Sequence, residues 1–330
     1  MSLTNKIENF WYLQPHQVRL LMPINSLLCV LTKLKRKLYK KGVFKTTTFQ
    51  RPVIVVGNIS VGGVGKTPFV AQLVLLLAKN NIRTGIVSRG YKASIADFPH
   101  KVSQDDSATL VGDEAFMLSH TVDVPLVIDP NRSRAVDYLI KTSDVDLIIS
   151  DDGLQHYKMD RQLELVLFDG ERGFGNQLIL PFGPLREAIE RLNETDLVIG
   201  NGEDFDGIAD SIVKLKNISL VQLTTREHFS LDEFTGVEVV GIAGIGNPNR
   251  FFKSLRKVCK IEKEISFPDH HNFSISDFEQ IEGDTLIMTE KDASKCYPFA
   301  QDNWYFLKIE MQFDAALESR LMNLINPLIK

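Results

Sequence analysis

Residues 52–68 read Pro-Val-Ile-Val-Val-Gly-Asn-Ile-Ser-Val-Gly-Gly-Val-Gly-Lys-Thr-Pro, and this stretch decides the fold. The apolar residues 52–57 predict a short buried strand, and residues 68–79 predict a helix whose proline is tolerated in the first turn. A glycine-rich turn between a buried strand and a helix is the setting of a phosphate-binding loop. The sequence therefore predicts a nucleotide-binding loop made of Gly62, Gly63, Val64, Gly65, Lys66, Thr67 and Pro68.

Each residue type in this loop suits the binding of a nucleoside triphosphate. Glycines let backbone N–H groups turn toward phosphate oxygens, and the helix N-terminus adds partial positive charge. We expect the Lys66 ammonium to reach the β- and γ-phosphates of ATP and the Thr67 hydroxyl to bind Mg²⁺. The strict motif has glycine at position 60, and the deviant form of some dimeric ATPases has lysine at position 61; this chain has Ser60 and Val61. The flanking strand and helix still favour a phosphate ligand over an empty glycine turn.

Outward from the loop, short apolar strands alternate with helical patterns, which is typical of an α/β fold with a mostly parallel sheet and flanking helices. A P-loop core is predicted over residues 49–216, with further strands at 84–88, 125–128, 145–150, 163–168 and 196–199. Polar, irregular sequence at 203–216 predicts the end of this core. Residues 217–330 predict a smaller α/β domain that closes the cleft, with strands at 237–242, 261–267, 285–289 and 304–311. Its closing helix, at 315–325, either stays with that domain or packs back on the core.

Two adjacent carboxylates, Asp151 and Asp152, follow the predicted strand at 145–150. The carboxyl end of a parallel strand is where a Mg²⁺-binding Walker B carboxylate belongs, although adjacent aspartates are also common in turns. We expect one of them to hold the metal and the other to orient a neighbouring group. Gln155 and His156 follow one turn later, as site residues or as satisfied loop residues.

Two further short motifs contain candidate acid–base residues. Asp113 and Glu114 follow Gly112 at the start of a predicted helix, where both would suit the helix dipole even without a catalytic role. Residues 267–273 read Phe-Pro-Asp-His-His-Asn-Phe and follow a predicted strand. Adjacent histidines point to opposite sides of an extended chain, which disfavours a metal site with two histidines. One histidine partnering an acid elsewhere in the chain is the preferred interpretation.

The N-terminal arm, residues 1–48, joins an apolar stretch at 20–32 to a segment with seven cations and no acid at 33–45. The stretch is too short to span a bilayer, and no signal-peptide cleavage pattern follows it. An apolar helix with a cationic flank suits an anionic membrane surface; the alternative is a core helix followed by a solvated basic turn. We expect an amphipathic helix in the membrane interface.

The composition argues against several other classes of protein. The chain has 330 residues and a net charge of −4, so it has no global basic excess that would indicate a nucleic-acid partner. Three widely spaced cysteines, Cys29, Cys259 and Cys296, favour neither a disulfide framework nor a zinc site and fit a reducing compartment. No obligate protein partner is indicated.

With these residues identified, the chain resembles the tetraacyldisaccharide 4'-kinase family over nearly its whole length. Seven stretches match in the family's order, which is far more specific than any one alone: 57–58 with 62–68, Ser88-Arg-Gly-Tyr91, Gly112-Asp-Glu114, Asp151-Asp-Gly-Leu-Gln-His156, Gly183-Pro-Leu-Arg-Glu187, Phe267-Pro-Asp-His270 and Thr289-Glu-Lys-Asp292. The resemblance implies transfer of the γ-phosphoryl group of ATP to the 4'-hydroxyl of a lipid-anchored, tetraacylated diglucosamine 1-phosphate in lipid A biosynthesis. It also implies peripheral attachment to the cytoplasmic face of the bacterial inner membrane.

The resemblance implies roles for residues at matching positions. Asp113 would accept the proton of the sugar hydroxyl with His270 as its partner, and a protonated His270 would favour the carboxylate form of Asp113. The metal would be held by residues of the loop and the acidic motifs, namely Thr67, Asp151, Asp152 and Glu114. The substrate cleft would be lined by Arg89, Gln155, His156, Arg186 and Glu187.

Other features remain open at this point. Ala188 stands where the family pattern has proline, which predicts a different shape for that loop, and Asn201 and Asp292 are candidates for contacting adenine. A P-loop kinase of a soluble small molecule would not need the arm. A membrane-recruited ATPase that switches a protein partner would not need the Asp113–His270 pair.

Overall fold

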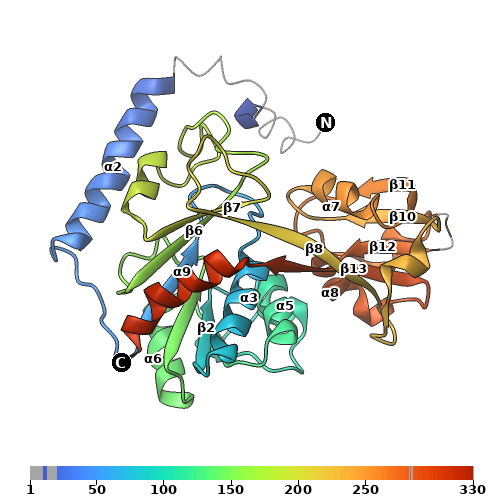
Figure 1. The fold of residues 1–330 in the computed structure, drawn as a ribbon, viewed down its shortest axis with the longest axis horizontal. Helices are drawn as coiled ribbons and strands as arrows, with labels where there is room; N and C mark the ends of the chain where they lie inside the picture. Colours follow the sequence, from blue (N-terminus) through green and yellow to red (C-terminus); the bar gives the residue numbers. More distant parts are fainter. Residues whose placement is uncertain (1–9, 13–20, 282, 284, 330) are drawn as a thin grey trace.

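A single sheet connects both predicted parts of the chain in the computed structural model, which describes residues 10–12, 21–281, 283 and 285–329 (Figure 1). The strands of the P-loop part are β1 (Val53–Gly57), β2 (Thr84–Ser88), β3 (His100–Lys101), β4 (Leu126–Ile128), β5 (Leu147–Asp151), β6 (Leu163–Asp169) and β7 (Leu197–Asn201). The remaining strands are β8 (Ser211–Gln222), β9 (His228–Phe229), β10 (Glu238–Ala243), β11 (Lys260–Ser266), β12 (Leu286–Thr289) and β13 (Trp304–Gln312). Their order is β11-β10-β12-β13-β8-β7-β6-β1-β5-β2-β4-β3, with β9 beside β8.

Helices cover both faces of the P-loop part because its strands are apolar on both sides. Ile54 and Val56 of β1 face α3 (Lys66–Lys79), α4 (Ala108–Val111) and α5 (Asp113–Thr121). Val53 and Val55 face the opposite layer, which contains α6 (Arg132–Thr142). The pairings β6–β1–β5–β2–β4 are all parallel, as the alternating pattern predicts. The predicted α/β fold class is confirmed.

Strand β8 corrects the sequence prediction at 203–216. Residues 211–213 pair in parallel with β7, and residues 214–222 pair antiparallel with β13. The predicted boundary between 216 and 217 therefore falls inside one continuous strand. The segment reads as polar because β8 is half-exposed there, with Lys214 and Lys216 turned to solvent. The two parts are thus joined by sheet rather than by a loop, and their division into domains stays a proposal.

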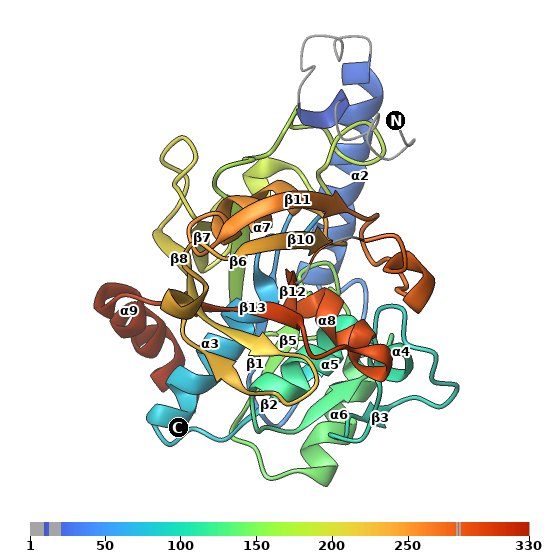
Figure 2. The same cartoon turned by 90° about the vertical axis from the view of Figure 1, so that its right-hand side faces the viewer.

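In the second part, α7 (Pro248–Leu255) and α8 (Glu290–Cys296) pack on opposite faces of β10, β12 and β13. Figure 2 shows α8 beside α5, so the second part meets the P-loop part at this helix pair. The closing helix, α9 (Ala315–Ile325), packs back on the core: Leu317, Leu321 and Ile325 share a buried cluster with α3.

Helix α2 (Met22–Lys40) lies along the outside of the P-loop part, away from β10–β12 (Figure 1). Asn25 anchors it by accepting a 2.7 Å hydrogen bond from the backbone N–H of Ile179. Its outer face exposes six large apolar side chains: Met22, Ile24, Leu27, Val30, Leu31 and Leu34. No helix in the described ranges is both long enough and apolar enough to cross a membrane. Residues 1–9 and 13–20 of the predicted arm lie outside the described residues.

Candidate active site

A cavity of about 1000 Å³ lies where the two parts of the chain meet. The phosphate loop forms one wall, the start of α5 and the turn after β11 form another, and β13 closes the far side. The carboxyl ends of β1, β5, β10 and β12 all point toward it, which is where ligands bind in open parallel sheets. The cavity therefore lies at the position that this fold offers for a substrate.

The phosphate loop has the predicted strand–loop–helix geometry. Gly65 caps α3 with a left-handed φ of +89°, and a Cβ at this position would lie 2.4 Å from Nδ2 of Asn201. Asn201 uses that same amide to donate a 2.9 Å hydrogen bond to the carbonyl of Val64. Lys66, nearly buried, donates to Oδ1 of Asn58 at 3.2 Å and lies 3.4 Å from Asp152. Asn201 thus supports the loop through the carbonyl of Val64, and the Lys66 ammonium lies next to Asp152 at the end of β5.

The two aspartates after β5 have different environments. Asp152 has a left-handed φ of +50° and accepts hydrogen bonds of 2.8 and 3.0 Å from Arg186. Burial raises its pKa, but the charges of Lys66 and Arg186 outweigh this and lower the pKa to about 2. Asp151 is buried, and neither of its carboxylate oxygens has a hydrogen-bond partner. Burial, followed by the charge of Glu114, raises the pKa of Asp151 to about 7.

These residues fit a Mg²⁺ ion. Buried carboxylate oxygens without partners are costly unless a cation or proton satisfies them, and Asp151 has two. In the described ranges, no group of three or more His, Cys, Asp or Glu side chains is arranged to hold a metal alone. Mg²⁺ is usually bound by one or two carboxylates together with substrate phosphates. Thr67, Glu114 and Asp152 line the cavity around this point.

Asp113 and His270 meet across the cleft. Nδ1 of His270 lies 3.1 Å from Oδ2 of Asp113, and both side chains are about 15% exposed. Burial raises the pKa of Asp113, but the hydrogen bond with His270 and the nearby lysine charges outweigh it, leaving this pKa below its usual value. His270 has a left-handed φ of +60°, a strained backbone that persists at functional sites when its surroundings hold it. The pairing predicted between the two parts is therefore present in the structure.

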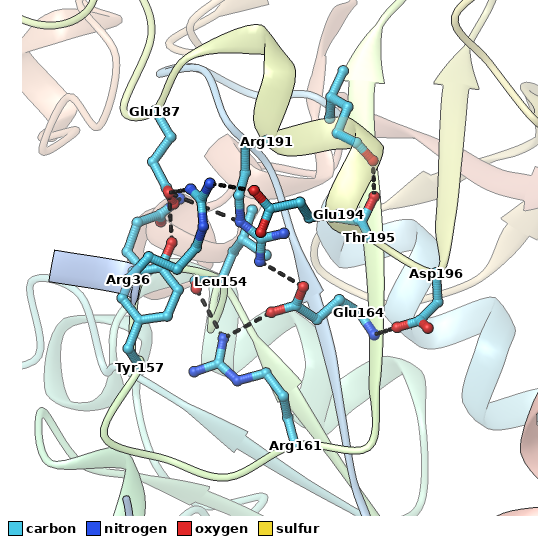
Figure 3. A network of polar contacts seen from close by, with 12 residues as sticks. Arg36, Leu154, Tyr157, Arg161, Glu164, Glu187, Arg191, Glu194, Thr195 and Asp196 are labelled. Carbon is cyan, nitrogen blue, oxygen red and sulfur yellow. Dashed lines mark hydrogen bonds and ion pairs between the residues drawn. The ribbon is translucent and has the colours of Figure 1, made fainter. Parts of the chain in front are cut away.

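Not every predicted cleft residue reaches the cavity. Arg89 and Arg186 line it, whereas Gln155, His156 and Glu187 are not among the described lining residues. Glu187 is buried and belongs to a polar network behind the cavity, where it accepts hydrogen bonds from Arg36, Gln155 and Tyr157 (Figure 3). The side chains of Gln155 and Glu187 are therefore engaged inside the protein, and direct substrate contact by Gln155, His156 and Glu187 stays a prediction.

Three further positions bear on expectations that stay open. Asp292 is fully buried, where Oδ2 accepts from the N–H of Gly244, so it does not face an adenine. Asn201 lines the cavity, but its side chain already donates to Val64 and accepts from Arg250. Ala188 has a φ of −62°, a value that proline also adopts, so the backbone at this residue is compatible with proline.

Comparison with known proteins identifies this architecture. A family model, "Tetraacyldisaccharide-1-P 4'-kinase", matches residues 17–326. The chain belongs to the tetraacyldisaccharide 4'-kinase family. A tetraacyldisaccharide 4'-kinase from Legionella pneumophila (strain Corby) is 43% identical over 93% of this chain and 94% of its own length. One from Psychromonas ingrahamii is 42% identical over 96% of this chain and 98% of its own.

A crystal structure of LpxK from Aquifex aeolicus, in an "apo" form in complex with ATP, superposes on this tetraacyldisaccharide 4'-kinase family member with a TM-score of 0.78. The two are 29% identical, and the alignment covers 94% of this chain and 98% of the other. The family's P-loop fold is thus present over nearly the whole chain.

Two lysines beside the Asp113–His270 pair were missed by sequence reasoning. Lys291 and Lys295 of α8 contact His270 and Asp113 respectively. The available signal was that Lys291 and Lys295 are four positions apart in the segment that follows Thr289. This spacing places both on one face of a helix.

Proposed function

We propose that this chain is an ATP-dependent kinase that transfers the γ-phosphoryl group of ATP to the 4'-hydroxyl of a tetraacylated diglucosamine 1-phosphate in lipid A biosynthesis. Family membership over residues 17–326 supports this function. The observation that carries it is the contact of Asp113 with His270 at 3.1 Å, since His270 lines the same cavity as the phosphate loop and Asp113 would act there as the proton acceptor. The soluble-substrate kinase and the switch ATPase are not favoured, since neither accounts for both this pair and the apolar face of α2.

The proposed roles follow from the contacts. Amides of the phosphate loop and Lys66 would bind the β- and γ-phosphates and neutralise their charge as the transfer proceeds. Arg186 would keep Asp152 oriented toward Lys66, since it holds that carboxylate by two hydrogen bonds. Asp113 would accept the hydroxyl proton late in a loose transition state, for which a carboxylate is a sufficient base.

A Mg²⁺ ion would be held by Asp151, Thr67 and Glu114, with Asp152 beside it. Bound there, it would neutralise phosphate charge and help to orient the transferred group. The partnerless oxygens of Asp151 support this assignment.

We further propose peripheral attachment through α2 to the cytoplasmic face of the inner membrane. Its six exposed apolar side chains lie next to a cationic segment, and an acylated acceptor stays in the bilayer. The division into an arm at 1–48, a core at 49–216 and a second domain at 217–330 stays part of this proposal.

The test is transfer of label from γ-labelled ATP to purified tetraacyldisaccharide 1-phosphate in mixed micelles, with product analysis for a 4'-phosphate. Labelled lipid that requires Mg²⁺ supports the function. Label transferred to a soluble sugar but not to the lipid would instead favour the soluble-substrate alternative.

A further inference from the structure

Helix α8 directs two lysines at the acid–base pair. Nζ of Lys291 lies 3.2 Å from Nε2 of His270, and Nζ of Lys295 lies 3.0 Å from Oδ2 of Asp113. The side chains are only 17% and 9% exposed, so neither is a solvated surface cation. Both lysines have a second partner that fixes the ammonium: Asp269 for Lys291 at 3.0 Å, and the carbonyl of His271 for Lys295 at 3.1 Å.

The Lys291 contact determines which ring nitrogen of His270 carries a proton. A lysine ammonium has three donors and no acceptor, so a hydrogen bond to Nε2 requires Nε2 to be unprotonated. The proton of a neutral imidazole then lies on Nδ1, which donates to Oδ2 of Asp113 at 3.1 Å. Oδ1 of Asp269 lies 3.9 Å from Nε2 and accepts from the same Lys291 ammonium at 3.0 Å.

We propose that Lys291 and Lys295 are positioning residues for the phosphoryl transfer: Lys291 holds His270 as the neutral Nδ1–H tautomer, and Lys295 with His270 clamps one oxygen of Asp113. This inference rests on the proposed function, because it assigns Asp113 as the proton acceptor. It also revises the expectation of a protonated His270. The positive charge beside Asp113 is that of Lys295, and the hydrogen bond with His270 orients the Asp113 carboxylate.

The clamp selects the oxygen that is offered to the substrate. Both donors end on Oδ2, which leaves Oδ1 as the oxygen that would take the proton of the acceptor hydroxyl. As the hydroxyl oxygen bonds to the γ-phosphorus, the bond from that phosphorus to the β,γ-bridging oxygen breaks and ADP leaves with the electron pair. The hydroxyl proton moves to Oδ1 of Asp113, and no further reactant is needed.

α8 belongs to the second part of the chain and Asp113 to the first, so the two lysines also tie the parts together at the reacting group. Lys295 lies on the same side of Asp113 as the turn that holds His270, and it donates to that turn through the carbonyl of His271. A single helix therefore fixes the acid, the histidine and the turn that presents the histidine.

A first experiment identifies the tautomer of His270 in the absence of substrate. Nuclear magnetic resonance of isotope-labelled histidine in the full chain, with the His270 ring signals assigned from a His270→Asn variant, reports which nitrogen is protonated. The wild type should show the neutral Nδ1–H form, and Lys291→Met should shift the ring toward the other tautomer or exchange between the two. A His270 signal that is doubly protonated in the wild type, or unchanged in Lys291→Met, overturns the role of Lys291.

A second experiment separates positioning from folding. In the micelle assay, Lys295→Met should lower kcat at least tenfold while the KM for ATP stays within twofold of the wild type, and Lys295→Arg should restore part of the loss. The matched control is Lys260→Met, which removes an exposed cation of β11 paired to Glu238. If kcat of Lys295→Met equals that of the control, or falls only together with the melting temperature, the clamp is refuted. If the wild type itself does not phosphorylate the lipid, the proposed function fails while the tautomer measurement still stands.

Discussion

Arg36 of α2 donates a 3.1 Å hydrogen bond to the side chain of Glu187. Glu187 directly follows Arg186, the residue that holds Asp152 next to Lys66. The helix with the exposed apolar face is therefore joined through one buried carboxylate, that of Glu187 (Figure 3), to the segment that contains Arg186.

Replacing Arg36 by methionine should destabilise the protein. Glu187 is buried and would lose a charged donor while keeping Tyr157 and Gln155, so we expect the free energy of unfolding to fall by about 2 kcal/mol. Urea denaturation measures it, with Lys35→Met, an exposed cation of the same helix, as the control. Equal stability of the two variants would show that the Arg36 contact contributes nothing to folding.

Lys66→Ala should leave the fold intact and lower kcat by about 100-fold or more, because its charge matters most as the phosphoryl group moves. The steady-state assay with lipid acceptor measures kcat, and thermal unfolding checks the fold. Near-normal turnover in the folded variant would refute the phosphate-loop assignment.

Asp113 and His270 should behave as one unit in a double-mutant cycle. Asp113→Ala and His270→Ala should each lower kcat strongly, and the double variant should be little worse than the poorer single variant, because either change disrupts the same contact. ATP affinity, measured by calorimetry, should barely change in all three. If the two losses add, or ATP binding collapses, Asp113 is better explained as a helix cap or metal ligand.

His156 should make stability fall in acid. Burial, then the charges of Arg132 and Arg89, lower its pKa from 6.5 to about 4, so below pH 6.5 the unfolded chain binds a proton that the folded chain resists. The stability that His156 contributes is present above pH 6.5 and is lost as the pH falls toward 4, on the order of 2 kcal/mol for this partly exposed ring. Urea denaturation at pH 7 and pH 4 should show a smaller loss in His156→Gln. The same loss in both proteins would contradict this origin.

Helix α2 should carry the membrane affinity. A double variant, Leu27→Asp with Leu31→Asp, places two charges on the exposed apolar face and should abolish sedimentation with anionic vesicles at low salt. The wild type should sediment and be partly released by salt, since the cationic contribution is screened over about 8 Å at physiological ionic strength. Unchanged sedimentation of the double variant would show that another part of the chain makes the membrane contact.

Much of the fold could be predicted because its signals are local. The predicted strands in the P-loop part differ from β1, β4, β5, β6 and β7 by at most two residues at either end and match β2 at both ends, since buried parallel strands are short apolar runs that a sequence displays directly. All of β8, residues 211–222, was missed because most of its residues are exposed or half-exposed, so the strand shows no such long run. The loop residues 62–68 were identified for the same local reason, as adjacent glycines between a strand and a helix have few other uses.

By itself, the sequence determined the parallel sheet, the phosphate loop and the family, all of which depend on residues that are close together in the chain or on motifs in a fixed order. Only the tertiary structure decided which side chains meet. Asp113 and His270 are 157 positions apart, and their contact depends on the β8–β13 pairing and on the packing of α8 against α5. The same packing aims Lys291 and Lys295 at the pair. No local periodicity encodes such long-range contacts, because they arise from the order of strands in the sheet and the way in which loops close over it.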